Sequence, residues 1–160
     1  MILYHGSNVA VQEPKILIPV RSLDFGAGFY TTSDEKQAVK CAKLQTFRRK
    51  TGIATVTSYD YDEATARNLL FLQFKSADGD WLNYIVQNRK GLYSGIKYDI
   101  VAGSVANDST ITVINDYMAG NIDENTALVL LKPQKLSDQY AFLTWRGLKV
   151  LRFREGKQYE

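Results

Sequence analysis

Short strand-like runs that alternate irregularly with helix-forming segments are the feature of this sequence that most constrains its fold. The runs are rich in β-branched and aromatic residues, while the helical segments begin at Ser or Asp and end near basic residues or glycine. Because the regular strand–helix–strand order of a parallel sheet is missing, the pattern favours an α+β fold, with residues 1–160 forming a single domain. We expect strands at 2–4, 29–32, 54–61, 98–102, 139–143 and 150–154, helices at 34–50, 63–71, 80–88 and 124–131, and either structure at 110–118.

The helix expected at 34–50 allows more detailed predictions. Ser33 is predicted to be its N-cap, and the basic run 48–50 loads its last turn before a glycine. The run is either a solvated helix end or part of a surface that binds an acidic acceptor. Residues that recur at helical spacing are expected to form the buried stripe of this helix: Ala38, Cys41, Ala42 and Leu44.

The composition of the chain excludes several classes of protein. Cys41 is the single cysteine, which rules out an intrachain disulfide and a cysteine-based zinc cluster, so we expect no metal site. The N-terminus lacks the segments of a signal peptide, and no apolar run approaches the ~20 residues that span a bilayer. The net charge of +3 permits an acidic partner such as nucleic acid without requiring one. These features predict a cytoplasmic protein that does not bind membranes.

The segment Tyr4-His5-Gly6-Ser7, at the end of the first expected strand, holds the one histidine of the chain. A histidine at a strand end often satisfies a backbone partner and does nothing more. It can also orient a ligand or move a proton, which requires a partner that the sequence does not reveal. Both interpretations of His5 stay open at this point.

The segment from Asp24 to Thr32 is a glycine-punctuated loop that leads into a β-prone run. Two glycines around a small residue, at 26–28, suggest the close approach of a ligand or of another backbone. They do not form a dinucleotide fingerprint, because no third glycine opens the next helix. Phe25 and Tyr30 offer flat faces for stacking on a ligand, or they belong to the core beside a turn.

The strand expected at 139–143 begins with a polar amide. Alternation places Gln139, Ala141 and Leu143 on one face and Tyr140 and Phe142 on the other. An amide that points inward costs free energy unless it is paired. Gln139 is therefore either held for a ligand or the last exposed residue before the strand is buried.

Taken together and in this order, the three segments resemble the signature of the diphtheria-toxin-like ADP-ribosyltransferases, which include the poly(ADP-ribose) polymerases. Those proteins have a His-Gly pair in the first strand, a Gly-x-Gly run ending in tyrosine before a helix, and a strand that begins with a glutamate. The chain also resembles a bacterial family of unknown function in the same clan, over nearly its whole length. The resemblance implies two small, mainly antiparallel sheets in a split sandwich, with peripheral helices and a central NAD⁺ cleft.

The resemblance also implies a chemistry, with NAD⁺ as the substrate and no metal. His5 would bond a ribose hydroxyl on the adenosine side, the Gly6 backbone would hold the nicotinamide carboxamide, and Tyr30 would stack on the nicotinamide ring. Gln139 would bond the 2′-hydroxyl of the nicotinamide ribose. The further residues implied for the same pocket are Ser7, Phe25, Gly28 and Thr31.

Two departures from the family pattern affect the expected activity. Gln139 stands where the family has its catalytic glutamate, and its amide carries no negative charge. Because Gln139→Glu would restore that charge, it would be expected to raise the turnover of NAD⁺. Asp138 points to the other strand face and is not expected to substitute. Cys41 occupies the position of a second stacking tyrosine, whose place Phe25 or Phe47 would have to fill.

These features favour one function and leave two alternatives. The leading expectation is a mono-ADP-ribosyltransferase that modifies a protein or nucleic acid, a chemistry compatible with a bacterial toxin restrained by an antitoxin. The first alternative is a catalytically silent module that binds NAD⁺ or ADP-ribose. A nucleic-acid-binding domain has little support, because the sequence has no aromatic and basic stripe.

The segment 99–108 is either a buried strand with a following turn or a loop of the substrate site.

Overall fold

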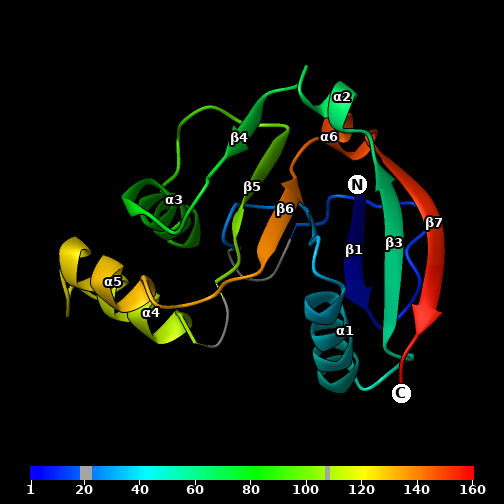
Figure 1. Ribbon diagram of the computed structural model, residues 1–160, viewed down its shortest axis with the longest axis horizontal. Coiled ribbons are helices and arrows are strands. Elements are labelled where there is room, and N and C mark those ends of the chain that lie inside the picture. The colour runs from blue at the N-terminus through cyan, green and yellow to red at the C-terminus, as the bar shows by residue number, and fades with distance from the viewer. Residues whose placement is uncertain (19–22, 107–108) are drawn as a thin grey trace.

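The computed structural model describes residues 1–18, 23–106 and 109–160, whose strands form two open sheets (Figure 1). One sheet is antiparallel throughout, and its strands in spatial order are β1 (Ile2–Ser7), β3 (Thr55–Tyr61) and β7 (Leu151–Gln158). The strands of the other sheet in spatial order are β2 (Phe29–Thr31), β6 (Asp138–Phe142), β5 (Ile100–Ser104) and β4 (Phe71–Gln73). In this second sheet β4 and β5 pair in parallel and the other neighbours are antiparallel. The expected α+β class, with mostly antiparallel sheets, is confirmed.

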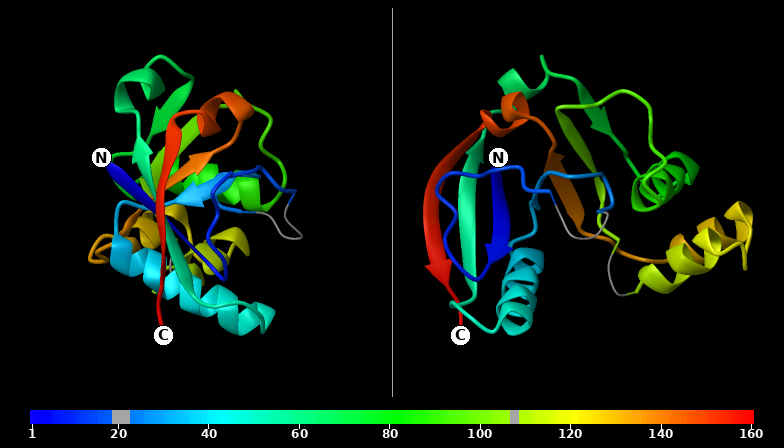
Figure 2. Two further views of the ribbon diagram at one scale, coloured as in Figure 1. Left: turned by 90° about the vertical axis from the view of Figure 1, so that its right-hand side faces the viewer. Right: turned by 180° about the vertical axis from the view of Figure 1, so that it is seen from behind.

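Helices surround these sheets. They are α1 (Glu35–Arg49), α2 (Glu63–Ala66), α3 (Gly79–Arg89), α4 (Ile111–Met118), α5 (Glu124–Leu131) and α6 (Trp145–Leu148). In the views from the side and from behind, α1 lies against the three-stranded sheet, whereas α3, α4 and α5 lie around the four-stranded sheet (Figure 2). Of the helices in the described ranges, none is long and apolar enough to cross a membrane.

Two hydrophobic cores share the four-stranded sheet. The core between the sheets joins Leu3 and Tyr59 of the first sheet to Ile100 and Phe142 of the second. The opposite face of the second sheet carries Ala141 and packs against α3, α4 and α5. The alternation expected along β6 is therefore confirmed, since its successive residues serve the two cores in turn.

Helix α1 covers the outer face of the three-stranded sheet. Its buried residues are Ala38 and Ala42, which pack with Val56 of β3. The expected buried stripe is wrong in part: Cys41 is half-buried and Leu44 is 40% exposed. Small alanines alone face the sheet because the backbone of α1 approaches β1 closely at this point.

The observed elements differ from the expected ones at several further places. The N-cap of α1 is Asp34, which accepts from the N–H groups of Lys36 and Gln37, while Ser33 bonds to Asp138. The helix expected at 63–71 ends at Ala66, because the following residues enter β4 and pair with β5. Most of the ambiguous segment 110–118 forms the helix α4, and residues 145–148 form the short α6, where no helix or strand was expected.

Candidate functional site

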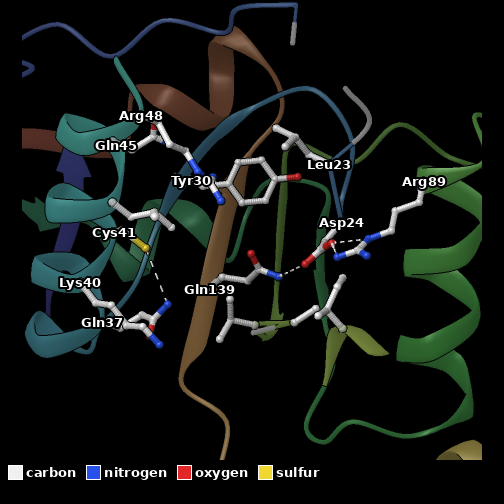
Figure 3. A pocket seen from close by; sticks show the side chains of 14 residues that line it. Leu23, Asp24, Tyr30, Gln37, Lys40, Cys41, Gln45, Arg48, Arg89 and Gln139 are labelled. Atoms are coloured by element: carbon white, nitrogen blue, oxygen red, sulfur yellow. Dashed lines mark hydrogen bonds and ion pairs between the residues drawn. The ribbon is translucent and has the colours of Figure 1, made fainter. Parts of the chain in front are cut away.

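A cavity of about 620 Å³ lies between α1 and α3, with β2 and β6 behind it (Figure 3). This volume is in the range of small-molecule sites, which are ~300–1,000 Å³. The lining side chains come from segments that are far apart in the sequence. They are Leu23, Asp24, Tyr30, Gln37, Lys40, Cys41, Leu44, Gln45, Arg48, Arg89, Val105, Ala106, Ile111 and Gln139.

Gln139 lies at the centre of this cavity, at the beginning of β6. Its amide nitrogen donates to a carboxylate oxygen of Asp24 at 3.2 Å and to the carbonyl of Ser104 at 3.3 Å. Both amide hydrogens are thereby used, and the amide oxygen turns toward Tyr30 in the cavity (Figure 3). The side chain is 7% exposed, so it presents one acceptor oxygen from a fixed position.

Asp24 and Arg89 form the wall opposite α1. Arg89 donates to one oxygen of Asp24 from Nε at 2.7 Å and from a terminal nitrogen at 2.5 Å. The side chain of Asp24 is 11% exposed and that of Arg89 is 18% exposed, so this ion pair is largely removed from solvent. It connects the loop before β2 to the last turn of α3, 65 residues further along the chain.

Tyr30 presents its ring to the cavity from β2. Its hydroxyl donates to the carbonyl of Gly26 at 2.6 Å and accepts from the N–H of Phe25 at 2.9 Å. Burial raises the pKa of Tyr30 far above its ordinary range, so the hydroxyl stays protonated. The Phe25 ring stacks against Tyr30, with centroids 6.5 Å apart, and supports it from the core. The ring is therefore fixed in orientation before any ligand arrives.

One side of α1 forms the remaining wall. Gln37, Cys41 and Arg48 recur at helical spacing along it, and Gln37 donates to the sulfur of Cys41 at 3.6 Å. Lys40 and Arg48 add two positive charges to the lining. Arg48 is exposed and can contact an anionic ligand from this wall.

His5 lies beside the cavity and does not line it. Its Nδ1 is 2.7 Å from the carbonyl oxygen of Tyr30, and its ring packs on Phe29 at a centroid distance of 4.3 Å. Since a carbonyl only accepts, Nδ1 must carry the proton, which leaves Nε2 as an acceptor in the neutral ring. The structure therefore brings His5 to the backbone of Tyr30 and brings Tyr30 and Gln139 into one cavity.

A titration of His5 is expected to give a pKa below the ordinary 6.5, because burial lowers it more than the bond to Tyr30 raises it. The unfolded chain then binds a proton first as the pH falls, so stability contributed by His5 declines below about pH 6.5. The single histidine makes its NMR resonances unambiguous. Urea unfolding at a series of pH values should show a smaller decline in His5→Gln than in the wild type. An NMR titration midpoint of His5 at or above pH 6.5 would contradict the burial of this ring.

Gly6 and Ser7 do not line the cavity. A Cβ atom on Gly6 would collide with the carbonyl oxygen of Ala38 and lie 2.7 Å from the nitrogen of Ala42, so α1 itself requires glycine here. Tyr4 exchanges backbone bonds with Thr32 at the edge of β1 that faces away from β3. Strand alternation turns the N–H and C=O of Gly6 to the same edge. Ser7 is buried and donates to Asn8 at 3.3 Å.

The other residues expected in the pocket have structural positions. Phe25 is 1% exposed and belongs to the core, so it presents no face to a ligand, and Phe47 is 80% exposed and is not part of the lining. Gly28 is required because a Cβ atom there would meet the β6 backbone at Phe142, 2.8 Å away. Thr31 is buried and donates to the carbonyl of Tyr140.

Acidic residues near the third motif also have structural contacts. Asp138 accepts from Thr32 at 3.1 Å and from the N–H of Ser33 at 2.8 Å, which fixes the turn before α1. Asp99 begins the segment 99–108, whose last two residues lie outside the described ones. It is 1% exposed and accepts from the N–H of Leu70 and the hydroxyl of Thr144. The strand interpretation is correct for β5, while Val105 and Ala106 reach the cavity.

Several residues of this site had no role in the predictions from the sequence. Asp24 lay in the motif from Asp24 to Thr32 but was given no role in it. Nothing in the sequence indicated that Arg89 or Lys40 belongs to a site. The roles of Asp24 and Arg89 follow from contacts between segments 65 and 115 residues apart, which no local pattern encodes. Among the described residues, no three His, Cys, Asp or Glu side chains are grouped closely enough to hold a metal ion.

Comparison with known protein families identifies the chain. Residues 1–153 match a family of proteins of unknown function, DUF3990, and the chain belongs to this family. No curated protein matches the chain significantly.

Proposed function

We propose that this protein is an NAD⁺-dependent mono-ADP-ribosyltransferase with the fold of the diphtheria-toxin-like enzymes. The observation that carries the proposal is the convergence of Tyr30 and Gln139, from two strands far apart in sequence, on one cavity. The two-sheet architecture and the resemblance of the three sequence motifs support it. A fixed aromatic ring, one polar acceptor and nearby cations are the groups that a dinucleotide needs.

The geometry suggests how NAD⁺ would lie. The nicotinamide ring would stack on the cavity face of Tyr30, whose other side packs on Phe25. The oxygen of Gln139 would accept a hydrogen bond from the 2′-hydroxyl of the nicotinamide ribose. Arg48 would attract the diphosphate from α1, because charge-assisted hydrogen bonds are the stronger ones.

The first strand would contribute from the edge of this cavity. The N–H and C=O of Gly6 point to the edge of β1 that faces away from β3, where a carboxamide could pair beyond the bridge between Tyr4 and Thr32. The Nε2 atom of His5 would accept from a hydroxyl of the adenosine ribose. In this proposal His5 also holds the carbonyl of Tyr30, and so fixes the stacking residue from behind.

The reaction would be driven by positioning and charge. The bond between ribose C1′ and the nicotinamide nitrogen breaks, and both of its electrons go to the ring nitrogen, so nicotinamide leaves uncharged. The ribose passes through an oxocarbenium-like state, and a lone pair of the acceptor forms the new bond to C1′. The acceptor's proton passes to solvent. Holding the reactants in this geometry supplies several kcal/mol of barrier lowering.

A second candidate function is a silent module that binds NAD⁺ or ADP-ribose. The observation in its favour is that Gln139 presents a neutral amide, with no carboxylate at this position of β6. Cys41 likewise offers no second aromatic wall, and neither Phe25 nor Phe47 replaces it. A module of this kind would use the same cavity and the same contacts without cleaving the glycosidic bond.

Incubation of the purified protein with NAD⁺ labelled in the adenylate half, together with a whole-cell lysate, separates these functions. We expect label on a protein or nucleic-acid acceptor. Such an acceptor would be reached in the cytoplasm, where we propose that the enzyme acts. Binding of NAD⁺ without transfer would favour the silent module, and the absence of binding would contradict both functions.

A role as a toxin further predicts that expression arrests growth, that a partner protein relieves the arrest, and that Tyr30→Ala abolishes it.

A further inference from the structure

The contacts of Gln139 select an amide over a carboxylate at this position. Its nitrogen faces two acceptors, a carboxylate oxygen of Asp24 and the carbonyl of Ser104, at 3.2 and 3.3 Å. A carboxylate in the same place would put oxygen against oxygen on both sides. Two like charges at such a distance in a largely buried site disfavour each other strongly.

Arg89 fixes the orientation of the Asp24 carboxylate, and this orientation leaves one oxygen for Gln139. Both donors of Arg89 reach the same oxygen, Oδ1, which leaves Oδ2 for the amide of Gln139. Among the described lining residues Asp24 is the one carboxylate, and the others that titrate or carry charge are Tyr30, Lys40, Cys41, Arg48 and Arg89.

We propose that Asp24 is the positioning residue of this site: it fixes Gln139 with its oxygen toward the ligand and carries the negative charge that related enzymes place on a glutamate. The catalytic part of this inference rests on the proposed function. In the related enzymes the charge stands on the strand residue itself. Here it is moved to the preceding loop, one hydrogen bond away from Gln139.

This arrangement reverses an expectation from the sequence. Gln139→Glu was expected to raise turnover by restoring the family's anion, but the new carboxylate would face Asp24 and Ser104. Its pKa would rise, because the charged form is opposed by a like charge and by a carbonyl. The compensating change is Asp24→Asn, whose amide can donate to the new carboxylate while its oxygen still accepts from Arg89.

Urea unfolding across pH tests the pairing without any ligand. The pKa of the carboxyl group introduced by Gln139→Glu would be raised in the folded protein but ordinary in the unfolded chain. The variant therefore loses stability as the pH rises above about 4.3, the ordinary pKa of a glutamate. Relative to wild type, we expect the folding constant of Gln139→Glu to fall at least tenfold between about pH 5 and pH 8. The double variant Asp24→Asn/Gln139→Glu should lose most of this fall.

Gln45→Glu is the matched control. Gln45 also lines the cavity, from α1, so it adds the same charge without facing Asp24, and its pH dependence should stay close to wild type. Equal pH dependence in Gln139→Glu and wild type would overturn the pairing, as would an unchanged fall in the double variant. If Gln139→Glu does not fold at pH 8, recovery of folding in the double variant supports the pairing and its failure overturns it.

Turnover of NAD⁺ tests the role of Asp24 in the chemistry. Asp24→Asn should lower kcat at least tenfold with a smaller change in KM, and Asp24→Asn/Gln139→Glu should recover much of the loss by moving the charge to residue 139. Unchanged kcat in Asp24→Asn would overturn the charge role. A wild-type protein that neither binds nor consumes NAD⁺ would remove the proposed function and this charge role together, while the unfolding data would still decide the pairing.

Discussion

Replacing Gly6 by alanine is expected to lower the free energy of unfolding by about 3–5 kcal/mol, an effect at the upper end for a single added methyl group. The Cβ atom would collide with the backbone of α1 at Ala38 and Ala42. Because the obstacle is main chain, no rotamer change or side-chain truncation relieves it. Helix α1 would have to move away from β1, and it carries one wall of the cavity.

A matched glycine separates this steric effect from a backbone effect. Gly120 has a positive φ of 78°, and a Cβ atom there would meet no atom of the described residues within 4 Å beyond its chain neighbours, so Gly120→Ala tests conformation alone. We expect it to cost only about 1 kcal/mol. Urea midpoints that are equal for Gly6→Ala and wild type would show that α1 does not approach β1 as described.

Removal of Asp99 is expected to have the second large effect on stability. Its carboxylate accepts from the hydroxyl of Thr144 at 2.5 Å and from the N–H of Leu70 at 3.0 Å. Asp99→Ala leaves these donors without their partner in a position that is 1% exposed. The expected loss is about 3–5 kcal/mol, the range for breaking a buried charged network.

Two further variants locate the source of this loss. Asp99→Asn keeps one acceptor and should cost less than Asp99→Ala. Arg146, 3.6 Å from the same carboxylate, is 67% exposed, so Arg146→Ala should change stability by less than about 1 kcal/mol. A larger loss in Arg146→Ala than in Asp99→Ala, by thermal or urea unfolding, would show that the surface ion pair dominates and that our assignment is wrong.

The sequence was informative where a local pattern and the tertiary structure agree. Alternation along 139–143 correctly assigned Ala141 and Phe142 to their faces, because both faces of β6 are covered, and Gln139 lines the cavity. The helix that begins after Asp123 was also predicted correctly, since the Asp123 carboxylate caps the N–H of Thr126. In these places one short segment contains the whole physical cause.

The sequence was less informative where long-range contacts decide. The three residues of β4 form a strand because they pair with β5, about 29 residues later, and their own propensities do not show it. Helix α4 lacks a side-chain cap, and its Ile114 is buried in the core shared with α3 and α5, so tertiary packing settles a pattern that was ambiguous. Asp24 joins the site through Arg89 and Gln139 for the same reason.

Calorimetric titration of NAD⁺ into the wild-type protein and Tyr30→Ala tests most directly whether the cavity is an NAD⁺ site. We expect saturable binding to the wild type and a loss of about 1–3 kcal/mol in Tyr30→Ala, the scale of a stacked aromatic in a desolvated site. Tyr30→Phe keeps the ring and should bind nearly as well, and Lys43→Ala, exposed on α1 outside the lining, should match wild type. No binding to the wild-type protein, or equal affinity in Tyr30→Ala, would contradict the account.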